Sequence, residues 1–259
     1  LNETRDVIVN ENSNLSDSSN KDNSLKPIML RDKKVIPFFL SDDKLNSKHG
    51  GGFLSSYLSL TTPLKVEIEF SGKKESFNFK CVCGAFLSEK AKYIQDETVR
   101  RKYVDELLNT LDYNIIEKIK DKYLPEIKKN QDYTLEWNRA RYDLMKKYTL
   151  QKFKNNSKLN KKLRNTDDVY LLEHPNNNKN SYWGNSISNN GKTIGLNMMG
   201  KLLMEVREEL HGIKSNFVRI DVSGMKKELN SKLSNNRTMR KMNKKMTARN
   251  TKKRTFGRK

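Results

Sequence analysis

The chain has 259 residues, of which 34% are hydrophobic and 32% charged, so it can form one good-sized core with polar segments outside it. Its formal net charge of +21 favours polyanionic partners, nucleic acid before an anionic membrane surface. No apolar run approaches the roughly 18 residues of a transmembrane helix, and no charged-then-apolar leader opens the chain. The sequence therefore predicts a protein that neither spans a membrane nor is secreted.

The cysteines are Cys81 and Cys83, two positions apart. They exclude a disulfide framework and predict a reducing intracellular compartment, the cytoplasm or nucleus, or an organelle if the N-terminus has been processed. A tetrahedral zinc site needs four donors, whereas the remaining candidates, His49, His174 and His211, stand singly. We predict neither a metal nor a cofactor.

Residues 1–25 consist mainly of Asn, Ser, Asp, Glu and Lys, and this composition predicts a disordered polar segment. The folded domain is predicted over 26–222, and an apolar segment at 35–40 opens it. Three glycines at 50–52 have no helix evident behind them, so we interpret them as a flexible loop and not as a phosphate-binding turn.

A β-hairpin is predicted next, because apolar and charged residues alternate on both sides of a polar turn at 71–74. Val66, Ile68 and Phe70 face one way before the turn, and a second set repeats the pattern after it: Phe77, Phe79 and Cys81.

The spacing of apolar residues then changes to that of helices, which are expected to fill the middle third of the chain. The first begins at Ala85 and places Lys90 close to its apolar face. Asp96 is the expected N-cap of the next, which carries an apolar stripe over 99–111. Two more are expected, at 115–124 before or around Pro125, and from Trp137 toward Phe153.

The stretch from 169 to 210 carries the main indications of function. Its apolar start, 169–172, predicts a strand that delivers Glu173 to the beginning of a polar loop. That loop contains Trp183, which is interpreted as a stacking wall for a base or ribose, with a core position as the alternative. A helix follows, with Asn197 as its expected N-cap and Gly212 as its stop.

Residues 217–222 are predicted as a last strand or a docked connector, and residues 223–259 as a basic tail. Between 226 and 259 there are 14 Lys and Arg residues against Glu228 alone. Residues 225–259 are thus expected to bind nucleic acid through its phosphates without reading sequence, or else to act as a solubilising tail. The main candidates are Lys241, Lys244, Lys245, Arg249, Lys252, Lys253 and Arg254.

Several stretches resemble the NADAR family, also called YbiA-like, and they run in order from about 36 to 212. The resemblance is carried by the following segments: Phe-Leu-Ser-Ser-Tyr at 53–57, Ala-Phe-Leu-Ser-Glu-Lys-Ala at 85–91, Trp137 with Arg141, Met145, Lys152, Phe153 and Asn156, Leu-Leu-Glu at 171–173, Tyr-Trp-Gly at 182–184, and Gly-Leu-Asn-Met-Met-Gly-Lys-Leu-Leu-Met-Glu-Val-Arg at 195–207.

The resemblance implies a single, mostly helical α+β domain with a small hairpin or sheet, which binds a ribosylated nucleotide or an ADP-ribose-like ligand. It also implies hydrolysis of an N-glycosidic bond, in an early pyrimidine intermediate of riboflavin synthesis or between ADP-ribose and guanine. Glu173 would stabilise positive charge on the ribose or activate water, Lys90 would assist the departing base, and Trp183 would stack. The other implied ligand-binding residues are Tyr182, Gly184 and Asn180, with Arg207 or Arg141 holding phosphate.

Two positions depart from the family's pattern. Cys83 stands where the family usually has Glu, and Asn180 where it usually has Asp. Neither a neutral thiol nor an amide is a general base at neutral pH. Either Glu173 and Glu89 therefore catalyse in a modified site, or the domain is a lapsed enzyme that binds nucleic acid or builds a larger particle through its tail.

Overall fold

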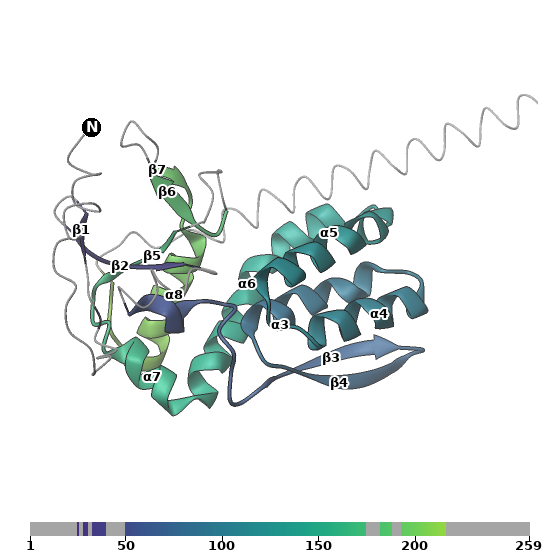
Figure 1. Cartoon of the computed structure of the whole chain (residues 1–259), viewed down its shortest axis with the longest axis horizontal. Coiled ribbons are helices and arrows are strands. Elements are labelled where there is room, and N and C mark those ends of the chain that lie inside the picture. Colours follow the sequence, from purple (N-terminus) through teal and green to yellow (C-terminus); the bar gives the residue numbers. More distant parts are fainter. Residues whose placement is uncertain are drawn as a thin grey trace, which may run out of the picture.

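The computed structural model describes residues 25, 28–30, 33–39, 50–174, 182–187 and 193–215. Within these ranges helices predominate over small sheets, so the fold is α+β and mostly helical, as predicted (Figure 1). The predicted segments that lie outside the described residues are the polar segment at 1–25 apart from Leu25, the 217–222 connector and the basic tail at 223–259. The same holds for Asn180.

Strand β2 (Lys33–Phe39) is the centre of a three-stranded sheet. It pairs antiparallel with β1 (Ile28–Leu30) and parallel with β5 (Tyr170–His174), and Phe38 lies opposite Glu173. The predicted apolar segment at 35–40 is this central strand. Its parallel partner, β5, is far away in sequence, and this pairing places Glu173 near the end of a buried strand.

The predicted hairpin is confirmed as β3 (Leu64–Phe70) and β4 (Lys73–Phe79), paired antiparallel. β3 alternates strictly between buried and exposed side chains. Ser71 and Gly72 both have positive φ, 48° and 75°, as the tight turns that match strand twist require. Cys81, predicted on the second strand, instead caps the next helix, where its Sγ accepts the Gly84 N–H at 3.3 Å.

The predicted helices are present, and α5 continues through Pro125. Asp96 caps α4 as expected, accepting the Val99 N–H at 3.0 Å. Leu111, predicted on that helix, lies beyond its end and is exposed. The helical elements are α3 (Val82–Ser88), the 3-10 helix η2 (Glu89–Tyr93), α4 (Glu97–Leu108), α5 (Tyr113–Lys129), α6 (Tyr133–Asn155), α7 (Ser157–Arg164), which was not predicted, and α8 (Met198–His211).

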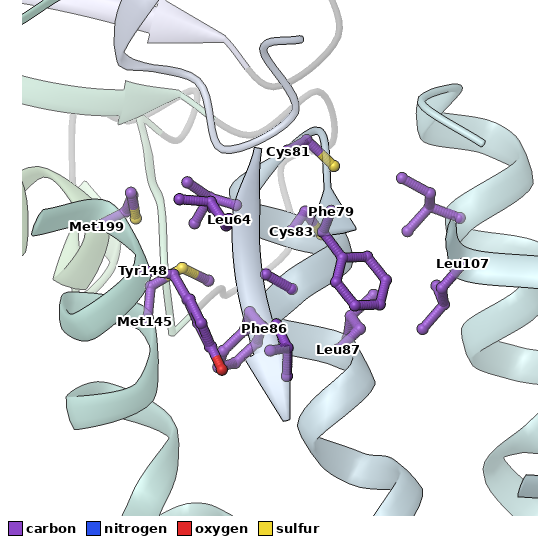
Figure 2. Packing of buried hydrophobic residues seen from close by; sticks show 14 of the residues in the cluster. Leu64, Phe79, Cys81, Cys83, Phe86, Leu87, Leu107, Met145, Tyr148 and Met199 are labelled. Atoms are coloured by element: carbon purple, nitrogen blue, oxygen red, sulfur yellow. The ribbon is translucent and has the colours of Figure 1, made fainter. Parts of the chain in front are cut away.

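One core joins these elements. Helix α6 packs against α3, α5, α7 and α8, while α3 covers β3 and β4 (Figure 1). Side chains from all of these elements belong to one buried hydrophobic cluster. Figure 2 shows the part of the cluster to which β3, β4, α3, α4, α6 and α8 contribute. The cluster includes Leu64, Phe79, Phe86, Leu107, Met145 and Met199. This shared core holds the hairpin half of the domain against the half that contains β5 and α8.

The glycines at 50–52 do not form the flexible loop predicted for them. Gly51 is buried in a short 3-10 helix, η1 (Gly51–Leu54), which packs on β2. A Cβ at position 51 would lie 2.5 Å from the Pro37 carbonyl oxygen. Glycine is therefore required for close approach of two backbones, a cause that the sequence alone does not distinguish from flexibility.

A similar close approach joins α8 to β5. A Cβ at Gly200 would lie 2.1 Å from the Leu171 carbonyl oxygen, so no larger residue fits without moving the strand. A two-stranded ribbon, β6 (Asn185–Ile187) and β7 (Thr193–Gly195), precedes this helix. The helix and the strand that ends in Glu173 thus form one tightly packed unit.

Candidate active site

Glu173 lies at the end of β5 and is only 2% exposed. Its Oε2 has no hydrogen-bond partner within the described part of the chain. Burial disfavours the charged form and raises the pKa of its carboxyl to about 8. At neutral pH Glu173 is therefore mainly a carboxylic acid that can donate a proton.

Asn197 holds this strand in place. Its Oδ1 accepts the Glu173 N–H at 3.0 Å, and its Nδ2 donates to the Leu171 carbonyl at 3.0 Å. The residue is the N-cap of α8, as predicted, but it has left-handed backbone angles and its side chain makes no capping hydrogen bond. Instead, the carbonyls of Tyr182 and Trp183 accept the first helical N–H groups, at 3.3 and 2.9 Å. The aromatic loop is thereby attached to the strand that carries Glu173.

Trp183 is half-buried and connects this unit to the helices. Its ring meets Phe86 of α3 edge-on, 5.7 Å between centroids, and Phe86 in turn lies 4.8 Å from Trp137 of α6. Tyr182 packs edge-on against Trp183 at 4.8 Å. Part of the Trp183 indole is thus core, while part stays accessible for stacking.

Lys90 lies in η2 and is 6% exposed, so it is not a surface lysine. Its Nζ stands 4.7 Å from the centroid of Trp137 and 5.9 Å from that of Tyr133. Burial, helped by the positive charges of Lys120 and Arg141, lowers the Lys90 pKa to about 8. The indole face partly replaces the water that this ammonium has lost.

Arg141 belongs to the same cluster. Its guanidinium carbon lies 3.6 Å from the centroid of Tyr182, and its Nε is buried without a partner within the described residues. Arg141 and Lys90 thus lie over rings of one aromatic cluster, which runs from Tyr182 through Trp183 and Phe86 to Trp137. Sequence reasoning left Arg141 and Arg207 as alternatives for a phosphate, and the structure places Arg141 beside the aromatic loop.

Helix α5 contributes two charged residues that the sequence analysis missed. The Tyr57 hydroxyl donates to Glu117 Oε1 at 3.3 Å, and Lys120 forms an ion pair with Glu117 Oε2. Tyr57 is the last residue of the 53–57 segment that resembles the family, so the sequence did indicate that Tyr57 could belong to the site. Glu117 and Lys120 form an i,i+3 pair that sequence alone does not separate from an ordinary solvent-facing pair.

Tyr113, the first residue of α5, packs against Tyr57. Its ring lies 5.0 Å from that of Tyr57. The pKa of Tyr113 is raised first by burial and then by the charge of Glu117, with smaller contributions from Cys83 and Glu173. Tyr57 thus contacts both the Tyr113 ring and the Glu117 carboxylate.

Two predicted site residues are engaged elsewhere. Glu89 accepts hydrogen bonds from the Tyr148 hydroxyl at 2.5 Å and from Lys147 at 3.4 Å, which directs it toward α6. The Arg207 guanidinium is fully buried below α8, where Nη1 donates to the Thr166 hydroxyl at 2.8 Å. These contacts give both residues structural roles in this conformation.

No group of three or more His, Cys, Asp or Glu side chains is placed to hold a metal ion in the part of the chain that the structure describes. Across the same residues, no helix is long and apolar enough to cross a bilayer.

The chain thus forms a mostly helical α+β domain with a buried carboxyl on β5, a buried ammonium on η2 and an aromatic loop that precedes α8. The model of the NADAR domain matches residues 45–211, more than half of the chain, and the protein belongs to the NADAR family. Among solved structures, the chain is similar to the NMR structure of the E. coli protein YbiA, with 24% identity and a TM-score of 0.42 over 70% of this chain and 87% of that one. No curated protein matches it.

Proposed function

We propose that this NADAR domain hydrolyses an N-glycosidic bond in a ribosylated base or nucleotide. The observation that carries the proposal is Glu173, a buried carboxyl with a pKa of about 8 whose Oε2 has no partner among the described residues, on the strand that Asn197 joins to the loop of Trp183. A buried acid with an unsatisfied oxygen is costly to keep, and groups of this kind gather at functional sites.

In this reaction the oxygen of water bonds to the anomeric carbon of ribose while the carbon–nitrogen bond to the base breaks. The departing nitrogen takes a proton from the Glu173 carboxyl, and the Lys90 ammonium stabilises negative charge that builds on the base. Trp183 stacks on the base or ribose, and Arg141 binds a phosphate. The role assigned to Glu173 is thus proton donation, because at neutral pH its carboxyl retains its proton.

The substrate class rests on family membership. Two substrates fit it, a ribosylaminopyrimidine phosphate of riboflavin synthesis and ADP-ribose attached to guanine. Both place an anion within reach of a site that already contains three cations, Lys90, Lys120 and Arg141. A neutral nucleoside leaves this positive charge unused and is the expected poor substrate.

The test is a hydrolysis assay on the full chain with each of these substrates, comparing wild type with Glu173→Gln. We expect a kcat loss of roughly 100-fold or more, since general acids contribute about that much. Glu67→Gln, on the exposed face of β3, is the control and keeps full activity. The wild-type rate is expected to fall as pH rises through about 8, where Glu173 loses its proton.

One observation favours a second function, that of a lapsed enzyme that binds nucleic acid or builds a larger assembly. Cys83 occupies the position of the family's usual glutamate, and burial raises the pKa of its thiol far above neutral, so it carries no charge. Folded protein that binds ADP-ribose or nucleic acid, yet turns over neither substrate, would establish this alternative. The basic residues at 225–259 are then its proposed nucleic-acid anchor.

A further inference from the structure

The proposed hydrolysis needs a group that accepts a proton from the attacking water. Water that attacks the ribose must lose a proton, and Glu173 arrives at that step already protonated, because its role is to supply a proton to the base. Lys90 is an ammonium at neutral pH and does not accept one either. A second carboxyl, in its charged form, is needed at the same site.

Glu117 of α5 has two partners of the kind that bind a carboxylate. It accepts a hydrogen bond from the Tyr57 hydroxyl at one oxygen and pairs with the Lys120 ammonium at the other. Both partners stabilise the charged carboxylate. Each carboxylate oxygen can accept more than one hydrogen bond, so a water molecule can still bind Glu117 while these contacts hold it.

Glu117 is also in the right place. Its charge acts on the neighbouring groups Lys90, Cys83 and Tyr113. Tyr57, which donates to Glu117, follows Ser56, whose carbonyl accepts the Cys83 N–H at 2.9 Å, so Glu117 lies beside the position where the family usually has a carboxylate. The Glu117 side chain is 33% exposed, which leaves it accessible to a water molecule.

Cys83 explains why a carboxylate on α5 is needed. The buried thiol lies against Tyr57 and within range of Glu117, so the phenol that holds Glu117 also contacts residue 83. A neutral thiol there provides no base. The negative charge of this corner of the site comes from α5 instead of α3.

We infer that Glu117 is the catalytic base of this domain, an inference that rests on the proposed hydrolysis. Its carboxylate takes a proton from water as the water oxygen bonds to the anomeric carbon. The carbon–nitrogen bond breaks, and the base leaves with the Glu173 proton. Glu117 therefore ends the step protonated and Glu173 ends it as a carboxylate, so the number of protons on the two side chains is unchanged. Tyr57 and Lys120 are positioning residues that aim the Glu117 carboxylate.

The experiment compares Glu117→Gln with Glu126→Gln in the full chain. Glu126 lies on the same helix and forms the same kind of i,i+3 pair, with Lys129 at 2.7 Å, so it is a matched control. We expect Glu117→Gln to lower kcat roughly 100-fold with little change in KM, and Glu126→Gln to leave both unchanged. Glu117→Asp, which keeps the charge but withdraws it by one methylene, is expected to lose kcat while retaining the wild-type Tm.

Rescue by azide distinguishes a catalytic base from a residue that only supports the structure. Azide attacks the ribose without losing a proton, so added azide is expected to restore cleavage in Glu117→Gln and to form a ribosyl azide. Glu173→Gln is not rescued, because the base still needs its proton. Full turnover in Glu117→Gln, or a loss that azide leaves unchanged, would overturn the inference while leaving the proposed hydrolysis intact. Absence of turnover in wild type on both substrates would overturn the two together.

Discussion

The side-chain oxygen of Asn197 accepts the backbone N–H of Glu173 at 3.0 Å and so links the start of α8 to the end of β5. Asn197 adopts φ 49° to do this, a conformation that few residues other than glycine and asparagine tolerate. Its own N–H donates to the Gly184 carbonyl at 3.0 Å. One residue thus joins the acid, the aromatic loop and the helix, and the geometry of the site depends on it.

The stability of the protein is expected to depend on pH through Glu173. The pKa of this carboxyl is raised from 4.5 to about 8 on folding, so the folded state binds the proton more tightly than the unfolded chain does. The resulting stabilisation is fully present below about pH 4.5 and is lost as pH rises through about 8. Glu173→Gln cannot ionise and escapes this loss.

We therefore expect Glu173→Gln to melt several degrees above wild type at about pH 9, at roughly 2–4 °C for each kcal/mol gained. The difference in Tm between Glu173→Gln and wild type should narrow steadily toward acid pH, where the side chain at position 173 is neutral in both proteins. Thermal melts at a series of pH values provide the measurement. A gap that is constant with pH would mean that Glu173 is not buried in its neutral form.

Ligand binding is expected to be reported by Trp183. The chain has two tryptophans, so Trp137→Phe leaves Trp183 as the only indole fluorophore. Its emission should change on titration with ADP-ribose. Trp183→Ala should weaken binding by about 1–3 kcal/mol, the range for removing a base–aromatic stack, and Trp183→Phe by less. A variant that lowers Tm but binds normally would assign this ring entirely to the core.

Arg207 is expected to matter for stability and not for ligand. Its guanidinium is buried and donates to the Thr166 hydroxyl and to the Val169 carbonyl, at 2.8 and 2.9 Å. Arg207→Ala should lower the free energy of unfolding by roughly 3 kcal/mol, because buried acceptors lose a charged donor. Arg139→Ala, on the exposed face of α6, is the control and should change it by less than about 0.5 kcal/mol. Urea unfolding measures the free energy of unfolding of both variants. An Arg207→Ala protein of wild-type stability that binds ligand more weakly would contradict this expectation.

Nucleic-acid binding is expected to depend on the basic tail. Replacing the seven candidates named in that segment by Gln should remove most of the affinity for duplex DNA or RNA. The slope of log K against log salt should flatten by about 0.7–0.9 for each phosphate that the tail no longer neutralises. Deleting residues 1–24 is the control and should change neither quantity. Unchanged binding after neutralisation would locate the anchor within the folded domain.

Local patterns were sufficient to predict the hairpin and most helices, because alternation and helical spacing report which face of an element is buried. β3 follows the predicted alternation along its whole length. The strand-to-loop pattern singled out Glu173 and helical spacing placed Lys90 near an apolar face, the family resemblance implied their roles, and the structure adds that both are buried.

Long-range features were not predictable in this way. The parallel pairing of β2 with β5 depends on segments far apart in the chain, and periodicity carries no information about partners. The family resemblance implied Arg207 or Arg141 as the phosphate ligand, and helical spacing did not reveal that the Thr166 and Val169 acceptors make burial of the Arg207 guanidinium tolerable. The sequence does not distinguish Glu117 and Lys120 from an ordinary i,i+3 surface pair, because only the fold brings the Tyr57 hydroxyl to Glu117.

The parallel β2–β5 pair has a consequence for how the protein is made. Val35 pairs with Tyr170, so nearly the whole domain must leave the ribosome before the strand that ends in Glu173 can find its neighbour. The hairpin and the α3–α5 helices, whose contacts are local, can form much earlier on the nascent chain. Until then Lys90, which lies in η2 between α3 and α4, can be in place without the proposed acid. The proposed proton donor therefore joins the rest of the site only near the end of translation of the domain.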